Sequence, residues 1–348
     1  MFPEWTWIVG LMIGAAIGSF LNVVIYRMPR LLSLGKPKHS FCPSCKHQLG
    51  MPDLVPLFSW LFSKGKCRHC GLKISSRYFW VELINGSLWA AIWYRYFCAD
   101  PTGSEWVLAC FYLLATAALV AIIFIDGEHY IIPDEINAFL LFLGIGFAIY
   151  SQFATNTPTW KPLLYGYLMG WGVIFGIAFL GRIAFGKDAM GHGDIKMMRG
   201  VGALLGPILT IFDVGIAVVT GLVFGLLFMG IQASKDSKAK AAGSGSGDSA
   251  AAAEVEEGVY EPESIKDLFI LGITYLLCFD IAAIWFPKIY GRMGYPVEDV
   301  SVEDDEWEPS LTTIPFGPYL AIGAIVCMLM RTELSQYASN VLQALNGS

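Results

Sequence analysis

The chain has 348 residues, of which 55% are hydrophobic and 15% charged, with a net charge of −6 and a mean hydropathy of +0.55. Soluble domains carry about 25% charged residues, so this composition argues against a soluble enzyme and against a disordered chain. An acidic chain with a pI near 5.4 also lacks the basic surface that a nucleic-acid partner requires. The sequence therefore predicts an all-α, polytopic protein of the lipid membrane, with modest parts outside it.

A helix needs about 20 apolar residues to cross a bilayer, and nine segments approach this length. In chain order they are Trp7–Tyr26, Phe79–Phe97, Trp106–Ile125, Ile136–Gln152, Leu163–Phe185, Ile195–Phe212, Val214–Ile231, Leu268–Phe286 and Ile314–Met330. The first has no basic leading region or cleavage site and is expected to be retained. Little more than Asp213 separates the sixth from the seventh, which predicts a tight helical hairpin.

The loop 27–77 contains ten Lys and Arg residues and one acid, Asp53. Such an excess of basic residues is typical of cytoplasmic loops. It predicts that this loop faces the cytoplasm and that the N-terminus lies outside. Alternation of the spans then places the loops 126–135 and 182–194 on the cytoplasmic side, and the second of these is also basic.

Composition divides the chain into six parts. They are a first transmembrane helix (1–26), a cytosolic cysteine loop (27–78), a transmembrane core (79–231), a flexible cytosolic linker (232–267), an extra hydrophobic segment with an acidic loop (268–313), and a last transmembrane helix with a tail (314–348). The linker is rich in Ala, Gly, Ser and acids, and such a segment cannot bury a core.

Four cysteines in the cytosolic loop form two CxxC pairs, Cys42/Cys45 and Cys67/Cys70, separated by 21 residues. Two such pairs can hold one Zn²⁺ as four thiolates, and the closed site indicates a structural metal. Disulfides and a redox role are the alternatives, and a reducing cytosol disfavours the first.

Other potential ligands are better interpreted as structural. Nearby His47 and His69 are expected to be polar surface residues. The remaining cysteines lie in or beside apolar spans and are expected to pack there without chemistry; they are Cys98, Cys110, Cys278 and Cys327.

Three acids fall at the cytoplasmic ends of predicted spans. Asp126 ends the third span, where the helix dipole disfavours an anion, so a functional role is favoured. Asp134 follows a proline at a helix start and is equally explained by ordinary N-terminal chemistry. Asp194 lies in the sequence GHGD, whose glycines allow a close backbone approach.

Two carboxyl groups held within a few ångströms share a proton. One of them then activates water as a base while the other donates a proton, which is the chemistry of aspartic peptidases. Near a membrane surface, the substrate is expected to be a membrane-embedded segment cut close to the cytoplasm.

The ordered motifs identify the chain as similar to the bifunctional type IV prepilin peptidases and N-methyltransferases of bacterial inner membranes. The motifs are GSFLNVVIYRMP (18–29), the paired CxxC loop, IDGEHYIIPD (125–134), GHGDIKMM (191–198) and PFGPYL (315–320). Each motif is of weak to moderate specificity alone, but the ordered set is highly specific. The family is related to other GxGD intramembrane aspartyl proteases.

The resemblance implies cleavage of the basic leader of prepilins and pseudopilins, after a glycine and before a residue that is usually phenylalanine. It further implies methylation of the new N-terminal amine by S-adenosylmethionine, with the pilus or type II secretion machinery as partner. The catalytic aspartates carry over to Asp126 and Asp194, with Asp134 and Lys196 as possible helpers. No residue is assigned to the methyl donor.

Two further motif residues, Asn22 and Arg27, are candidates for shaping the site, with Arg27 favoured as an ordinary positive-inside anchor. The chain departs from the family by about 80 residues inserted before PFGPYL. A ninth span at Leu268–Phe286 would reverse the last helix, so eight or nine spans remain open. Asp280 within that segment argues against a simple lipid-exposed span.

Three alternative functions remain. The first is a peptidase without methylation, which the intact cysteine pairs disfavour. The second is a transporter with a cytosolic zinc module, although transport sites lie near the midplane of the bilayer. The third is a zinc-containing scaffold for pilus assembly without catalysis.

Overall fold

The structure, a computed structural model, describes residues 2–37, 39–42, 44–100, 105–155, 160–186, 190–242, 264–285 and 315–346. Its helices are α1 (Trp7–Arg27), α2 (Phe58–Phe62), α3 (Arg77–Trp93), α4 (Trp106–His129), α5 (Asp134–Thr155), α6 (Trp160–Phe185), α7 (His192–Leu205), α8 (Pro207–Ala242), α9 (Ile265–Leu276), α10 (Phe279–Trp285), α12 (Gly317–Leu329) and α13 (Arg331–Asn346). The only strand-like pairing in these ranges is two isolated bridges in the cysteine loop. The all-α prediction is confirmed.

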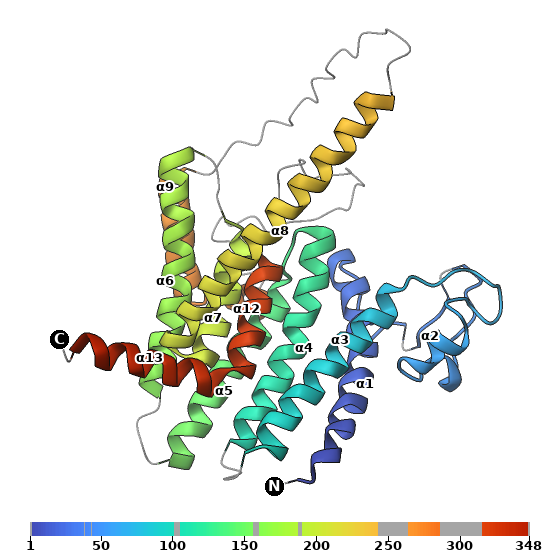
Figure 1. Cartoon of the computed structure of the whole chain (residues 1–348), viewed down its shortest axis with the longest axis horizontal. Helices are drawn as coiled ribbons and strands as arrows, with labels where there is room; N and C mark the ends of the chain where they lie inside the picture. Colours follow the sequence, from blue (N-terminus) through green and yellow to red (C-terminus); the bar gives the residue numbers. More distant parts are fainter. Residues whose placement is uncertain are drawn as a thin grey trace.

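Helix α4 occupies the centre of the bundle (Figure 1). In its apolar window 72% of the residues are buried, against 28–44% in the other helices that are long and apolar enough to span. Its inner residues are small or β-branched, such as Ala115, Ala121 and Ile122, and all three are at most 1% exposed. The apolar part of α4 is therefore surrounded mostly by protein.

Five helices of the described residues are long and apolar enough to span a membrane, and up to seven if each of two bent helix pairs counts as one span. This is fewer than the eight or nine spans expected from hydropathy. Helix α7, with 14 residues, is about 21 Å long and shorter than a bilayer core of about 30 Å. The predicted span Phe79–Phe97 is α3 continued by a π-helical turn at Tyr94–Cys98.

The predicted hairpin boundary at Asp213 is wrong. The chain turns at Gly206, whose φ of +82° lies in the left-handed region that favours glycine. Pro207 then begins α8, which is continuous through Asp213 to Ala242. Asp213 is fully buried and faces α12, where a Cβ on Gly323 would clash with it. Hydropathy alone placed the break at a charge, whereas the backbone places it at a glycine–proline pair.

The start of α12 lies at the same end of the bundle as Asp126. A Cβ on Gly317 would lie 2.6 Å from the Asp126 carboxylate, and further along the helix the Met328 carbonyl accepts a hydrogen bond from Tyr96. Arg77, at the start of α3, pairs with Glu128 at this end too. We call it the site end. The cysteine loop, which precedes α3, therefore leaves the bundle at the site end.

The extra hydrophobic segment is not a straight span. Helices α9 and α10 meet at a 71° bend, which describes a broken span or a re-entrant loop. Helix α8 runs antiparallel to α12, since Asp213 lies beside Gly323 and the later Gly221 lies beside the earlier Tyr319. Helix α8 therefore leaves the bundle at the site end, where α12 begins. The chain between them must enter and leave the membrane on one side, which favours the re-entrant arrangement and keeps PFGPYL beside Asp126.

The predicted linker is partly helical, because α8 continues to Ala242 and projects beyond the bundle (Figure 1). The rest of the linker, 243–263, and the predicted acidic loop, 287–313, lie outside the described residues. At the other end of this segment Ser264 caps α9, its hydroxyl accepting a hydrogen bond from the backbone N–H of Asp267 at 3.2 Å.

Glycines set the spacing between α6 and α7. A Cβ on Gly170 would lie less than 3.0 Å from the carbonyl oxygen of Met198, which is backbone and cannot rotate away. We expect Gly170→Ala to lower the free energy of unfolding by about 1–3 kcal/mol, because the added methyl must push the helices apart. Thermal denaturation in detergent measures this, with Gly172→Ala on the same helix as control, since nothing lies within 4 Å of that position. Equal melting temperatures for both variants would contradict the assigned helix contact.

Candidate functional site

Three motifs from distant parts of the sequence meet around Ile132 at the site end. A Cβ on Gly193 of GHGD would lie 2.9 Å from the Ile132 Cβ, and one on Gly317 of PFGPYL would lie 2.9 Å from the Ile132 Cδ1. Both approaches require glycine. The expectation that the GHGD motif allows a close backbone approach is therefore met, and the group approached is a side chain of IDGEHYIIPD.

Asp126 lies in the last turn of α4 and is 6% exposed. The backbone N–H of Gly317, which begins α12, donates a hydrogen bond to its carboxylate. The C-terminal end of a helix repels a carboxylate, and the Gly317 N–H gives the Asp126 carboxylate a favourable partner there. The last helix therefore supplies the partner of Asp126, a contact that no local sequence pattern indicated.

Asp194 lies in the first turn of α7 and is also 6% exposed. Its Oδ1 is buried without a hydrogen-bond partner in the described residues. The carboxyl groups of Asp126 and Asp194 lie close enough to interact electrostatically. The structure thus brings together the two aspartates that the sequence singled out, at one end of the bundle and largely shielded from solvent.

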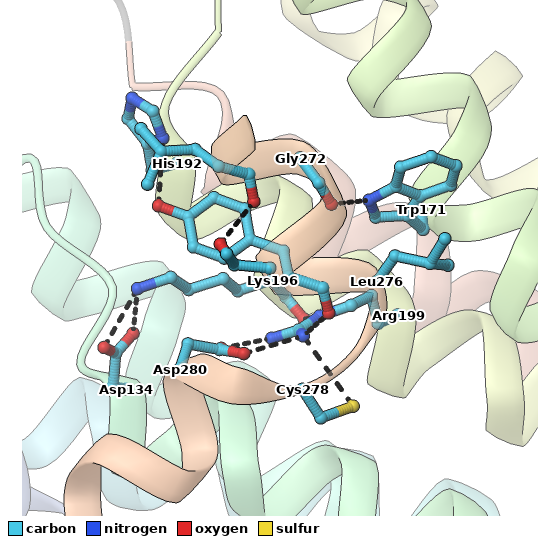
Figure 2. A network of polar contacts seen from close by, with 12 residues as sticks. Asp134, Trp171, His192, Lys196, Arg199, Gly272, Leu276, Cys278 and Asp280 are labelled. Carbon is cyan, nitrogen blue, oxygen red and sulfur yellow. Dashed lines mark hydrogen bonds and ion pairs between the residues drawn. The ribbon is translucent and has the colours of Figure 1, made fainter. Parts of the chain in front are cut away.

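Lys196, two residues after Asp194 on α7, forms an ion pair with Asp134 (Figure 2). The Lys196 ammonium donates to both carboxylate oxygens of Asp134, at 2.8 and 2.9 Å. The pair joins the start of α7 to the start of α5. Asp134 is 41% exposed, so the pair lies at the rim and not within the buried centre.

Two charged residues that the sequence reading left unpaired form a second, buried pair. Arg199 of α7 contacts Asp280 of α10 through two hydrogen bonds, one of 3.0 Å, and is 1% exposed (Figure 2). Arg199 is therefore buried within the bundle, against α10. The sequence signal for this pair was that each of the two predicted spans contains one of these charged residues. The argument that Asp280 does not face lipid is confirmed.

The four loop cysteines form one cluster in which all sulfur atoms lie within 4.8 Å of one another. The Cys42 and Cys70 sulfurs are 3.8 Å apart, close to the edge of a tetrahedron with Zn–S bonds of about 2.3 Å. Each pair occupies a tight turn, and in the second the backbone N–H of Gly71, with φ of +72°, donates to the Cys67 carbonyl. This donor set fits a tetrahedral metal.

The surroundings of Cys42 favour the ionised form of its thiol. The backbone N–H of Cys45 is the main cause that lowers the pKa of Cys42, to about 7. A metal binds the thiolate and not the thiol. The rings of His47 and His69 lie 3.5 Å apart between centroids, and neither residue belongs to the sulfur cluster.

The other cysteines differ from one another. Cys98 and Cys327 are buried, as packing residues are expected to be, whereas Cys110 is exposed. Cys278 lies at the α9–α10 bend, 3.3 Å from the Tyr167 hydroxyl.

Buried polar groups attach the cysteine loop to the bundle. The Arg27 guanidinium is 8% exposed and donates to the carbonyls of Ser33, Leu34 and Pro37, so it organises the start of the loop and is not a surface anchor. Asn22 donates to the Tyr78 carbonyl at 3.1 Å. Sequence reading missed a third attachment.

That attachment is Glu82 of α3, which accepts a hydrogen bond from the backbone N–H of Leu57 at 2.7 Å and is 7% exposed. An acid inside the predicted span Phe79–Phe97 was the signal for it. It ties the middle of the cysteine loop to the bundle.

Two family models match the chain. The bacterial peptidase A24 N-terminal domain matches residues 12–96, and the type IV leader peptidase family matches residues 113–226. The first range contains most of α1, the cysteine loop and α3, and the second contains Asp126, Asp134 and Asp194. No solved structure matches the chain significantly.

Curated relatives match over most of their length. A prepilin leader peptidase/N-methyltransferase of Dichelobacter nodosus is 32% identical over 60% of this chain and 79% of its own. One of Myxococcus xanthus is 28% identical over 93% of this chain and 90% of its own. A type 4 prepilin-like proteins leader peptide-processing enzyme of Escherichia coli is 31% identical over 62% of this chain and 82% of its own.

The fold and the site thus define a multi-span helical membrane protein with a buried pair of aspartates at one end and a four-cysteine module beside it. These matches show that the chain belongs to the type IV leader peptidase family, together with the prepilin leader peptidase/N-methyltransferases.

Proposed function

We propose that this chain cleaves the basic leader of type IV prepilins and pseudopilins with Asp126 and Asp194 and then N-methylates the new N-terminus. The observation that carries the proposal is the meeting of the two buried carboxyl groups with Ile132, Gly193 and Gly317 at one end of the bundle. Family membership supports the reaction class.

The proposed cleavage needs one carboxylate and one carboxylic acid. Two buried carboxyl groups so close together avoid a double negative charge by sharing one proton. The ionised aspartate takes a proton from water, whose oxygen attacks the scissile carbonyl carbon. The other aspartate gives its proton to the carbonyl oxygen, which forms a tetrahedral intermediate. As the C–N bond breaks, the first aspartate passes the proton it took from water to the leaving amine, and the second recovers its proton from a hydroxyl of the intermediate.

Lys196 and Asp134 are proposed to position the site. Lys196 follows Asp194 by two residues on α7, and its ion pair with Asp134 holds this turn against α5. With Asp134 41% exposed, the pair also lies where a substrate chain would pass. Neither residue is needed for the proton transfers above.

For methylation we propose S-adenosylmethionine as the donor, since the relatives are named as N-methyltransferases. When bound, S-adenosylmethionine would supply the methyl group that the new N-terminal nitrogen receives. No residue is assigned to the donor. The cysteine module supports the bifunctional reading over a peptidase without methylation.

Zn²⁺ is proposed to bind Cys42, Cys45, Cys67 and Cys70. Four thiolates leave no open position on the metal, so it would stabilise the loop and take no part in the reaction. The loop has few buried apolar groups of its own, and metal binding would supply its folding free energy.

The proposed location is the bacterial inner membrane, with the N-terminus in the periplasm and both the cysteine loop and the aspartates at the cytoplasmic face. A prepilin would then place the junction between its basic leader and its apolar helix at the aspartates. The mature products serve the pilus or type II secretion machinery, which we propose as the wider partner.

We expect Asp126→Asn and Asp194→Asn each to lower leader cleavage by about 100-fold or more, because general acid–base catalysis contributes that much. Purified protein is incubated with a prepilin in detergent, and the products are weighed by mass spectrometry. Asp213→Asn is the matched control, since Asp213 is an equally buried aspartate that faces Gly323 and not the site. Near-normal cleavage by either test variant would refute the assigned pair.

We expect Gly317→Ala to lower the cleavage rate by about 10-fold to 100-fold, since the added methyl would lie 2.6 Å from an Asp126 oxygen and displace it. Single-turnover kinetics measure this. Gly215→Ala serves as control, because nothing lies within 4 Å of that position. An unchanged rate in Gly317→Ala would show that this backbone contact does not orient Asp126.

Metal analysis of purified protein is expected to find about one zinc per chain, and less in Cys42→Ser, which removes one of four thiolates. The control is Cys110→Ser, an exposed cysteine outside the cluster. Equal zinc content in both variants would exclude the proposed site.

A further inference from the structure

Helices α9 and α10 pack directly on the two helices that carry and support Asp194. The Trp171 indole of α6 donates to the Gly272 carbonyl at 3.0 Å, and the Tyr167 hydroxyl donates to the Leu276 carbonyl at 2.6 Å. Gly272 leaves no room for a side chain, because the Phe175 ring lies against it. The segment is thus seated on α6 by specific contacts, some of which Figure 2 shows.

The bend between α9 and α10 makes backbone acceptors available. The last carbonyls of a helix have no partner within it, and in apolar surroundings they need one. Here Cys278 adopts a φ of +59° and turns the chain by 71°. The carbonyl of Tyr275 then accepts a hydrogen bond from the guanidinium of Arg199.

Arg199 lies on α7, five residues after Asp194, and is 1% exposed. Its guanidinium binds the Asp280 carboxylate through both terminal nitrogens, in the forked geometry that arginine favours. Asp280 is 7% exposed. A charged residue inside a membrane protein is costly unless paired, and such residues mark functional positions.

Tyr275 of α9 contacts the GHGDIKMM motif of α7 at two residues. Its hydroxyl lies 3.1 Å from Nδ1 of His192, and its ring lies 5.0 Å from the Lys196 ammonium. Three consecutive turns of α7 therefore contact α9 or α10, through His192, Lys196 and Arg199. Lys196 also binds Asp134 of α5, so α7 is held by contacts with both α5 and α9 (Figure 2).

We propose that Asp280 and Arg199 are positioning residues of the peptidase reaction, and that the α9–α10 segment completes the site by holding α7 so that Asp194 faces Asp126. This inference rests on the proposed function of the two aspartates. Neither Arg199 nor Asp280 contacts the reacting atoms. Their effect is on the placement of α7, while the cysteine loop is attached to α1 and α3, which carry neither aspartate.

The test compares two activities of full-length Asp280→Asn in detergent. Leader cleavage is measured on a purified prepilin, and methyl transfer from S-adenosylmethionine is measured on the same pilin already cleaved. We expect kcat for cleavage to fall by as much as about 100-fold with a smaller change in KM, because misplacement by about 1 Å has this effect. Methyl transfer to the cleaved pilin is expected to stay within about twofold.

The matched control is Glu333→Gln, which removes the acid of another arginine pair, Arg95–Glu333, at 2.8 Å between the π-helical turn and α13. It is expected to retain both activities. Arg199→Lys keeps the positive charge but not the guanidinium that binds both carboxylate oxygens. Its cleavage rate is expected to fall less than that of Asp280→Asn. This variant also keeps the test decisive if Asp280→Asn does not fold.

Unchanged cleavage by folded Asp280→Asn and Arg199→Lys would overturn the inference. An equal loss of cleavage and methylation would overturn it as well, since that result indicates a general structural role. Failure of the wild-type protein to cleave the prepilin would instead refute the proposed function, so the two failures are distinguishable.

Discussion

Charged groups buried at membrane depth must find partners within the protein, and this constraint organises the site end of the bundle. Lipid offers no hydrogen bonds, so each ion needs a counter-ion or a polar backbone group. Arg199 meets Asp280, and Asp126 meets the backbone N–H of Gly317. Each contact joins helices that are distant in sequence, so satisfying the charges also assembles the site.

Glycine residues allow these helices to approach one another closely. The backbone of Gly193 and that of Gly317 approach Ile132 more closely than any side chain would allow. Between α6 and α7 the same device appears at Gly170 and Gly202, where the helices touch backbone to backbone. Close packing of this kind is how helices associate in lipid, where burial of apolar groups gives little driving force.

The parts of the chain that build the site extend beyond the regions matched by the family models, which end at residue 226. Helix α12 lies after that point, yet its first residue, Gly317, is the hydrogen-bond donor to Asp126. Helices α9 and α10 also lie after it, and they hold α7 through Arg199 and Tyr275. The late segment is thus structurally part of the half of the bundle that holds Asp126 and Asp194.

The amino-acid sequence by itself determined the helical membrane class, the four-cysteine cluster and the two aspartates, because each depends on local composition or on short spacing. It did not determine where α7 ends, because hydropathy placed the break at the charged Asp213, whereas the backbone turns at the glycine–proline pair 206–207. Nor did it determine the partners of Arg199, Glu82 or Asp280, which come from other helices. Hydropathy treats every span as a separate rod in lipid. Only the packing of those rods against one another decides which charges meet, which segment bends back, and which glycine lies against Asp126.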